Sequence, residues 1–411
     1  MMKSALFICV MAMSLSGFAM PRLMSTSTDE ADTTSDTTSV VADRCTTDSV
    51  AADTTKKRNI FRKIIDYYAN ANKRTDYRKF NFGVIPGPHY SSTDGFGIGI
   101  IATGTYSMDK SDPTLPLSNV DIYGDFTTKG KVNVGIRGTN IFKQERQRLE
   151  YKVKTEFCPT DFWGVGYEQG AVDYDTVPNY KNLQVEAMVR YLFRIAPKTY
   201  LGPIAHFRYM KAHSIKTQNT QVFDGLDRDA LATTVGLSFT FDNRDFRLNA
   251  YKGCFIQFDQ TFTPRFLGNG DNHFITSELT LCGYQKLWKG AVLAGEFHTQ
   301  LNYDGQPSWL MKAEAGSPYR MRGYYEGRYR DNNIMEVQLE LRQHIWKRNG
   351  IVLWAGTAKV FPDFKQWGDS KFLPNWGIGY RWEFMKRINL RIDYGFTRDG
   401  GGLIFNMNES F

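Results

Sequence analysis

The sequence has few of the residues that would mark a metal centre or a disulfide-stabilised domain. Its cysteines are Cys9, Cys45, Cys158, Cys254 and Cys282, and none lies in a CxxC or Cys/His ligand pattern. These spacings do not form a small-domain disulfide framework, although pairing among the later cysteines in an oxidising compartment stays open. We therefore expect no metal site and no cofactor.

The chain also lacks the short motifs of common hydrolases. It contains no Gly-x-Ser-x-Gly and no His-Glu-x-x-His segment, and its six histidines show no ligand spacing. No nucleic-acid-binding module is visible. We predict that the protein is not an enzyme, with one alternative left open: a Ser/His pair brought together by strand geometry, as in an outer-membrane phospholipase.

Long hydrophobic runs are missing beyond the first residues. The mean hydropathy of -0.42 would suit a soluble protein, and no later window resembles a membrane-spanning helix. A membrane β-barrel has a similarly low mean hydropathy, because residues that face lipid alternate with residues that face the lumen. The missing runs therefore do not exclude a membrane protein built from strands.

The first residues have the form of a secretory signal peptide. Lys3 precedes an apolar run from Ala5, and Gly17-Phe18-Ala19 provides a small-x-small cleavage site. We predict that residues 1–19 are removed. An N-terminal membrane anchor is the alternative, but the run is shorter than the ~20 apolar residues of a spanning helix.

Two further segments precede the main domain. Residues 20–57 are rich in Ser, Thr and Asp and have no aromatic residue, which predicts a disordered tether. Residues 58–79 predict a basic amphipathic helix whose apolar face carries Ile60, Phe61, Ile64, Ile65 and Tyr68. Such a helix could close the mouth of a barrel, lie on an anionic leaflet, dock a partner or simply be solvated.

The rest of the chain alternates polar and apolar residues. In residues 181–194 one face carries Leu183, Val185, Ala187, Val189, Tyr191 and Phe193, and the other carries Gln184, Glu186, Met188, Arg190 and Arg194. A period of two predicts strands. A soluble sandwich also alternates, but its strands average about 6 residues. Here the strands are longer, their polar faces carry long charged side chains, and aromatic residues gather at their ends.

We predict an all-β fold, a transmembrane antiparallel β-barrel over residues 80–411 with about sixteen strands. The strands are expected to begin near Phe96, Val120, Lys131, Leu149, Trp163, Leu183, Tyr200, Ala230, Phe255, Phe274, Val292, Ile334, Val352, Trp376, Ile388 and Leu403. Short connections at 128–131, 196–198 and 347–350 should then lie at one end. The opening stretch and the long connections at 214–228 and 361–373 should lie at the other.

The last residues continue the alternation and stop on an aromatic side chain. Leu403, Phe405 and Met407 share one face, and the chain ends at Phe411. This ending is typical of the C-terminal recognition signal of outer-membrane proteins. We predict that Phe405 and Phe411 form that assembly signal, with Phe411 facing lipid at the end of the last strand.

Residues 317–331, SPYRMRGYYEGRYRD, form an unusual connection between two expected strands. They contain four arginines, four tyrosines and two glycines, whereas ordinary surface turns prefer Asn, Asp, Ser and Pro. Arg322-Gly323-Tyr324 resembles the V-R-G-F/Y signature of the bacterial surface antigen family. That family includes the barrel-assembly factor BamA, its relative TamA and the two-partner-secretion transporters.

Two other stretches share the resemblance. DNRDFRLNAYKG, with Asp242, Arg244, Asp245 and Gly253, is similar to the family's D-x-R-D...G periplasmic turn. WGIGYRW, with Gly377, Gly379 and Arg381, is similar to its Gly-x-Gly-x-Arg strand. The resemblance covers roughly Gly87 to Phe411, and the order and spacing of the motifs make the set more specific than any one of them.

The resemblance implies that the long loop folds back into the lumen and that Arg322 meets an acidic or aromatic patch on the inner wall. A guanidinium keeps its charge there and needs a carboxylate or an aromatic face to hold it. The family usually has an Asp on the second strand after the loop, where this chain has Trp354. Glu340, on the inward face of the preceding strand, is the candidate partner.

The family also implies a location and a function. We expect the protein in the outer membrane of a Gram-negative bacterium, contacting membrane lipid and lipopolysaccharide and inserted by the barrel-assembly machinery. Its formal charge of +8 is interpreted as cations that line the lumen and meet lipopolysaccharide phosphates. Relatives that assemble or translocate proteins carry periplasmic POTRA domains, for which the sequence before Phe80 has no room.

Three functions stay open at this point. The first is assembly or translocation of proteins or lipids at the outer membrane, with a separate periplasmic partner as a possible helper. The second is a porin-like small-solute channel, and the third is a structural anchor or surface antigen. The family resemblance favours the first.

Overall fold

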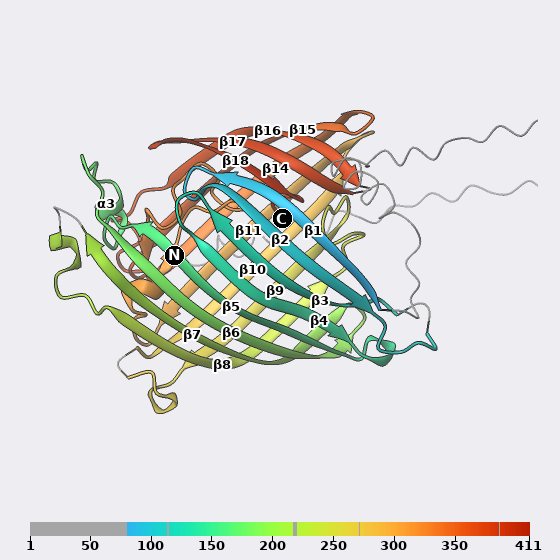
Figure 1. The fold of residues 1–411 in the computed structure, drawn as a ribbon, viewed down its shortest axis with the longest axis horizontal. Helices are drawn as coiled ribbons and strands as arrows, with labels where there is room; N and C mark the ends of the chain where they lie inside the picture. Colours follow the sequence, from blue (N-terminus) through green and yellow to red (C-terminus); the bar gives the residue numbers. More distant parts are fainter. Residues whose placement is uncertain (1–79, 113–114, 217–219, 271, 386) are drawn as a thin grey trace, which may run out of the picture. The chain divides into compact units, whose positions relative to one another are not determined.

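Sixteen antiparallel strands close into one barrel in the computed structural model (Figure 1). The structure describes residues 80–411 apart from 113–114, 217–219, 271 and 386. The predicted signal peptide, tether and amphipathic helix of residues 1–79 lie outside the described residues. None of the helices in the described part of the chain is long and apolar enough to cross a membrane.

The barrel strands follow each other around the wall in chain order, with β11 next to β14. They are β1 (Asn81–Ser91), β2 (Gly95–Tyr106), β3 (Ser118–Thr127), β4 (Val132–Ile141), β5 (Gln147–Asp161), β6 (Asn179–Ala196), β7 (Thr199–Lys216), β8 (Asp229–Asp242), β9 (Gly253–Thr263), β10 (Phe274–Lys286), β11 (Ala291–Tyr303), β14 (Asn333–Trp346), β15 (Asn349–Phe361), β16 (Leu373–Met385), β17 (Ile388–Thr397) and β18 (Gly400–Met407). The connections contain the short elements η1 (Lys143–Glu145), α3 (Tyr167–Gly170), η2 (Thr220–Phe223), η3 (Arg265–Leu267), η4 (Trp309–Met311), β12 (Ala313–Glu314) and β13 (Arg330–Asp331).

Inward and outward side chains alternate along the wall. On β16, Trp376 and Ile378 are exposed on the outer face, whereas Gly377, Gly379 and Arg381 face the lumen and are buried. The outward residues are largely apolar and the inward residues mostly polar, which is the pattern of a membrane β-barrel. The alternation predicted from the sequence is confirmed.

The predicted number of strands is confirmed, but two of the individual strand predictions are wrong. Residues around Trp163 form no strand; they belong to the connection 162–178, in which Phe162 and Trp163 are buried. Conversely, β1 lies in the opening stretch, which was expected to be a long connection, and it contains Pro86 and Pro88. Proline lacks the N–H of a ladder hydrogen bond and is therefore confined to edge strands, and β1 has one sparsely paired edge.

These two errors also place one short turn at the wrong end of the barrel. The turns β6–β7 (197–198) and β14–β15 (347–348) lie at the same end, as predicted, and we call it the short-turn end. The β3–β4 turn at 128–131 lies at the opposite end, with residues 304–332 and 362–372. We call this second end the long-loop end.

The barrel closes where β1 meets β18, and this seam is the most sparsely paired junction in the wall. β1 pairs with β2 along its whole length, from Asn81↔Thr105 to Ser91↔Gly95. It pairs with β18 only at Tyr90↔Phe405 and Ser91↔Ile404. The two strand edges at the seam therefore carry few ladder hydrogen bonds to each other.

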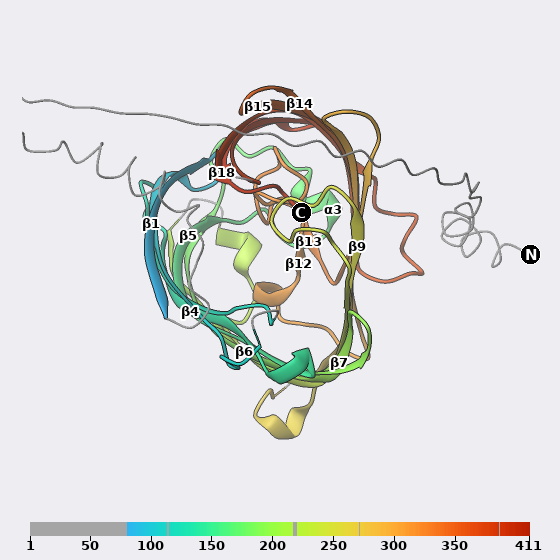
Figure 2. The same cartoon turned by 90° about the vertical axis from the view of Figure 1, so that its right-hand side faces the viewer.

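The lumen is occupied from both ends, as the view along the barrel shows (Figure 2). From the long-loop end, residues 304–332, which we call the inner loop, place β12 and β13 inside the ring of strands. From the short-turn end, residues 243–252 reach inward, and Ala250 packs against Tyr284 and Phe411. The C-terminus also lies inside the ring.

The two ends of the barrel differ in charge. At the short-turn end the exposed cations are Lys110, Lys143, Arg146, Arg194, Lys198, Arg247, Lys252, Lys286, Lys289, Lys347 and Arg348, and among the described residues of that end Asp245 is the exposed carboxylate. At the long-loop end the exposed carboxylates include Glu168, Asp173, Asp175, Asp224, Asp227, Asp229, Asp304, Asp363 and Asp369, and the exposed cations among its described residues are Lys129, Lys181, Arg228, Arg265, Lys365, Lys371 and Arg398. The exposed positive charge is therefore concentrated at the short-turn end.

Candidate functional site

The inner loop is held by two aromatic clusters near the long-loop end. Trp309, Leu310 and Met311 of η4 pack against Phe162 and Tyr180 in a buried cluster. Further along, the tyrosines of the loop pack together: the rings of Tyr324 and Tyr329 meet edge to face, and Tyr329 stacks on Tyr167. Tyr324 also donates a hydrogen bond from its hydroxyl to the carbonyl oxygen of Pro374, at 2.9 Å.

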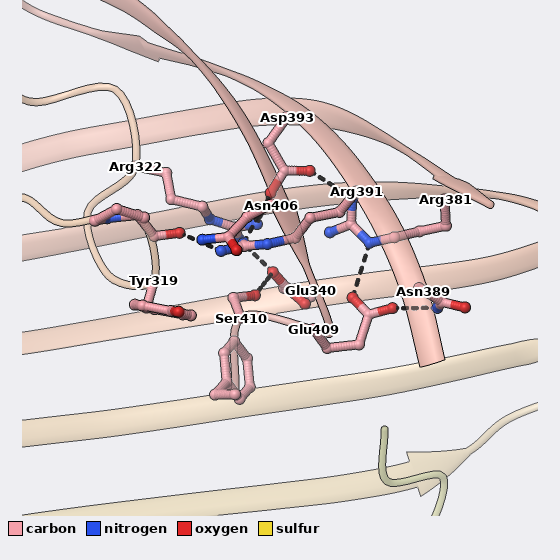
Figure 3. Close-up of polar contacts among 12 residues, drawn as sticks. Tyr319, Arg322, Glu340, Arg381, Asn389, Arg391, Asp393, Asn406, Glu409 and Ser410 are labelled. Atoms are coloured by element: carbon pink, nitrogen blue, oxygen red, sulfur yellow. Dashed lines mark hydrogen bonds and ion pairs between the residues drawn. The ribbon is translucent and has the colours of Figure 1, made fainter. Parts of the chain in front are cut away.

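Two residues before Tyr324, Arg322 lies against the inner wall and its side chain is fully buried (Figure 3). Its guanidinium forms ion pairs with Glu340 of β14 and with Asp393 of β17, the latter at 2.8 Å from Nη1 to Oδ2. The guanidinium carbon also lies 3.8 Å from the centroid of the Trp354 ring on β15. A buried guanidinium needs such partners, because an uncompensated charge in a low-dielectric interior is very costly.

Arg322 belongs to a larger buried network on the wall formed by β14, β16 and β17 (Figure 3). Arg381 joins Asp393 to Glu409, with Arg381 Nη1 2.5 Å from Asp393 and Arg381 Nε 2.8 Å from Glu409. Arg342 pairs with Glu340 at 2.8 Å, and Arg391 pairs with Asp393 at 3.1 Å. Shared carboxylates therefore couple the loop arginine to three arginines of the wall.

The backbone of the inner loop also fits closely against the wall. Gly323 has a φ of +105°, and a Cβ on it would lie 2.7 Å from the carbonyl oxygen of Gly395 on β17. A Cβ on Gly395 would in turn collide with the carbonyl oxygen of Arg322. Glycine is required on both sides because the two backbones are in contact.

The Gly-x-Gly-x-Arg stretch of β16 makes room for the same network. Gly377 pairs with Trp354 across the ladder, and a Cβ on Gly377 would collide with the indole ring. Gly379 pairs with Asp393, and a Cβ there would collide with the carboxylate. These glycines therefore leave the space in which Trp354 and Asp393 reach Arg322.

The inner loop contacts both sides of the β1–β18 seam. Gly323 lies against β17 and β18, since a Cβ on Gly402 would be 3.3 Å from the Cα of Gly323. On the other side of the seam, the amide of Glu326 donates a hydrogen bond to Oγ1 of Thr93 in the β1–β2 turn, at 3.4 Å. The loop thus spans the junction on its luminal side.

The Asp242–Gly253 motif forms a second fixed structure at the short-turn end. The carboxylate of Asp242 accepts a bidentate pair of hydrogen bonds from Arg244, from Nε to Oδ1 at 2.9 Å and from Nη2 to Oδ2 at 3.0 Å. Asp245 pairs with Arg387 of the β16–β17 turn at 2.9 Å, and Arg387 also donates to the carbonyl oxygen of Asn249. This pairing holds the β8–β9 connection across the mouth of the barrel.

The electrostatics of this turn follow from the same contacts. Asp245 accepts backbone hydrogen bonds from Tyr251 and Lys252, and these bonds and Arg387 outweigh burial and lower the pKa of its carboxyl. Gly253 has a φ of +101°, and a Cβ on it would lie 2.6 Å from the carbonyl oxygen of Asn243. The motif glycine is therefore required by the backbone itself.

Of the two aromatic residues assigned to the C-terminal signal, one is not where we predicted. Phe405 lies on β18, paired with Ile392 on the outer face. Phe411 lies beyond the end of the strand and points into the lumen, with the Arg342 guanidinium 5.1 Å from its ring centroid. The prediction of a lipid-facing Phe411 is wrong, because the last residues turn inward, where Ser410 donates to Glu340 and Glu409 meets Arg381.

The structure therefore brings Arg322, Glu340, Gly377, Gly379 and Arg381 together, and it places the Asp242–Gly253 motif elsewhere, at the short-turn end. Sequence reasoning missed Asp393 as a partner of Arg322. Its inward position was predictable from the alternation of β17, but the neighbouring strand that it faces was not. No group of three or more His, Cys, Asp and Glu side chains suited to a metal ion occurs among the described residues.

Comparison with known proteins gives a consistent result. Residues 123–411 match the Omp85 superfamily domain. The fold is similar to that of BamA from Haemophilus ducreyi lacking POTRA domains 1–3, with a TM-score of 0.56, 14% identity, and coverage of 80% of this chain and 70% of that chain. It is also similar to CdiB from Escherichia coli, with a TM-score of 0.52, 10% identity, and coverage of 85% and 70%. No curated protein sequence matches the chain.

Proposed function

Because the chain belongs to the Omp85 superfamily, we propose that it assembles or translocates proteins or lipids in the outer membrane of a Gram-negative bacterium. The observation that carries this proposal is the seam, which joins β1 and β18 at only two residue pairs. Strand edges with unmade hydrogen bonds are unfavourable in lipid. A sparsely paired junction is therefore the part of the wall that separates at the lowest cost and can accept a substrate.

The inner loop, in this proposal, holds the seam closed between transport events. Its contacts with Gly395 and Gly402 on one side and with Thr93 on the other support this role. Arg322 fixes the loop to the wall through Glu340, Asp393 and Trp354. A substrate that opened the seam would have to displace or shift these contacts.

The filled lumen argues against the porin-like alternative. A porin needs a continuous aqueous channel, whereas the inner loop, residues 243–252 and the C-terminus all enter the barrel here. We expect little steady single-channel conductance from the protein in planar bilayers. We further propose that a separate periplasmic partner delivers the substrate and that the barrel-assembly machinery inserts the protein itself.

A disulfide lock tests the seam directly. Tyr90→Cys with Phe405→Cys, in a chain whose own cysteines are replaced by alanine, should crosslink the paired positions of β1 and β18. In cells that depend on the variant, the oxidised lock should change the protein or lipid content of the outer membrane as depletion of the protein does, and a reductant should restore it.

The matched control crosslinks a fully paired junction. Ile98→Cys with Phe126→Cys joins β2 to β3, also on the outer face, and it should leave function intact. Equal function of the two locked forms would contradict transport through the seam and would favour an anchor or surface-antigen role.

A further inference from the structure

Two neighbouring hairpin turns at the short-turn end are tied together. β11 pairs with β14 in the barrel wall, so the β10–β11 and β14–β15 turns lie side by side. The amide of His344 donates to the carbonyl oxygen of Gly290 at 2.7 Å, and Nε1 of Trp288 donates to Oε1 of Gln343 at 2.9 Å. The two turns therefore act as one rigid surface.

This surface presents indole rings on the outer side of the barrel. Trp288 is 56% exposed and Trp346 is 61% exposed. Trp346 pairs with Asn349, which pairs in turn with the outward-facing Trp382. Exposed tryptophans at the end of a membrane barrel are typical of the interfacial girdle, where the ring lies at the level of the lipid headgroups.

Three cations lie beside the two indoles. Lys289 follows Trp288, while Lys347 and Arg348 follow Trp346, and all three are exposed. Within the described residues, none of them has a carboxylate in ion-pair distance, unlike Lys143 and Arg247 of the same end, which face Asp109 and Asp242. Their positive charge is therefore available to an external anion.

We propose that these two turns form a binding site for the headgroups of anionic phospholipids, of the phosphatidylglycerol class. The indoles would lie among the headgroups and upper acyl chains, and the lysine and arginine side chains would reach the phosphates. The leaflet concerned would be the periplasmic one, an orientation that rests on the proposed function, since the Asp242–Gly253 motif is similar to a periplasmic turn. The headgroup site itself does not depend on transport through the seam.

The distribution of charge favours lipid over a soluble acidic partner. Exposed cations occur on short-turn connections around the barrel, from Lys110 and Lys143 to Lys198, Lys289 and Lys347. A single protein partner would cover one footprint, whereas the lipid annulus surrounds the whole rim. Basic residues beside a membrane surface attract anionic lipids, and ionic strength weakens this attraction.

Lipid selectivity measured by electron paramagnetic resonance tests the proposal. The full chain is reconstituted in phosphatidylcholine vesicles with a trace of spin-labelled phosphatidylglycerol or spin-labelled phosphatidylcholine, and the motionally restricted fraction is compared. We expect phosphatidylglycerol to associate preferentially, with a preference that falls as NaCl is added. The combined change Lys289→Gln, Lys347→Gln and Arg348→Gln should reduce the preference by about twofold or more.

The matched control removes exposed cations from the other end. Lys129→Gln, Arg228→Gln and Lys365→Gln should leave the lipid preference unchanged, and the heat-dependent gel mobility of both variants checks that the barrel has folded. Equal association of the two lipids with the unmodified chain would overturn the proposal, as would an equal effect of the two variants. Binding of polyaspartate without any lipid preference would assign the cations to a soluble acidic partner instead. Failure of the seam-lock experiment alone would leave the headgroup site intact.

Discussion

The guanidinium of Arg322 lies 3.8 Å from the ring centroid of Trp354 on β15, where the family resemblance led us to expect an aspartate. The carboxylate charge is supplied instead by Glu340 and Asp393 on other strands. Trp354 donates no hydrogen bond here, since its Nε1 is buried without a partner among the described atoms. Its contribution is therefore the aromatic face, which attracts a desolvated guanidinium through the ring quadrupole.

Arg322→Ala should release the inner loop without unfolding the barrel. Removing one side of a buried ion pair costs about 3–5 kcal/mol, and here it would leave both Glu340 and Asp393 short of a partner. We expect faster protease cutting between Ser317 and Asp331 and larger or noisier conductance. Arg322→Lys should restore the protection of the loop only partly, because an ammonium lacks the planar set of N–H donors with which a guanidinium reaches two carboxylates.

Arg265→Ala, which removes an exposed arginine of another connection, is the control. Equal protection of the loop in all three variants would show that Arg322 has no role in docking it.

Trp354 offers a way to separate the aromatic face from its polar atom. Trp354→Phe should keep most of the loop protection, because the unpartnered indole N–H is lost without breaking a hydrogen bond. Trp354→Ala should lower the free energy of unfolding by about 3–5 kcal/mol, the usual range for an emptied aromatic site. Protease digestion measures the protection of the loop in both variants. Urea unfolding followed by far-ultraviolet circular dichroism in detergent micelles measures their free energies of unfolding. A phenylalanine variant as unstable as the alanine variant would contradict the assignment to the ring face.

Gly323→Ala tests the backbone contact while leaving every charge in place. The new Cβ would meet the carbonyl oxygen of Gly395, and the φ of +105° adds strain of at least about 1–2 kcal/mol. Loop protection from protease should fall, as for Arg322→Ala. Gly283→Ala on β10 is the matched control, because a Cβ there would meet nothing within 4 Å. Protection that stays unchanged in Gly323→Ala would show that the close approach is not needed for docking.

The sequence predicted which side chains of the barrel wall face inward better than it predicted the contacts that these side chains make inside the barrel. Alternation along a single strand predicted the inward position of Glu340, because that position depends on a local period of two. Which inward side chains meet across the lumen depends on strand register and on the path of the inner loop. Neither is encoded within a single segment, so Asp393 was not recognised as a partner.

The errors at the two termini of the barrel have related causes. β1 was missed because the opening stretch was assigned to a connection; it contains two prolines, which a strand that pairs with β18 at only two residues can accommodate. Phe411 was placed toward lipid by extending the alternation of β18, but the strand ends at Met407. The last residues turn inward because the buried arginines of the wall, Arg342 and Arg381, need acceptors. Both features depend on the closed barrel.

The inward position of Phe411 changes the effect expected of its substitution. Phe411→Ala should lower the free energy of unfolding, since the ring packs with Tyr284 and under the Arg342 guanidinium. Phe405→Ala removes an outward aromatic side chain of β18 and serves as the comparison. If Phe411 also acts as an assembly signal, its substitution should in addition slow insertion by the assembly machinery in pulse-chase experiments. Loss of equilibrium stability with a normal insertion rate would restrict Phe411 to packing within the lumen.

Docking of the inner loop should depend on pH through Glu326. Burial raises the pKa of this carboxyl to about 7, with Glu314, Asp94 and Glu156 adding repulsion and Lys131 opposing them. Because the pKa in the folded state lies above the ordinary value of 4.5, the folded state favours the protonated carboxyl of Glu326. The contribution of this protonated carboxyl to the stability of the docked loop is fully present below about pH 4.5. It is lost as the pH rises through about 7.

Protease protection of the loop should therefore be greater at pH 5.5 than at pH 8.5. The Glu326→Gln side chain cannot ionise, so protection of the loop in this variant should stay at the low-pH level of the unmodified chain at both pH values. The ratio of the cutting rates of the two proteins is taken at each pH, because this ratio cancels the pH dependence of the protease itself. A ratio that does not change between these pH values would show that Glu326 does not control the loop.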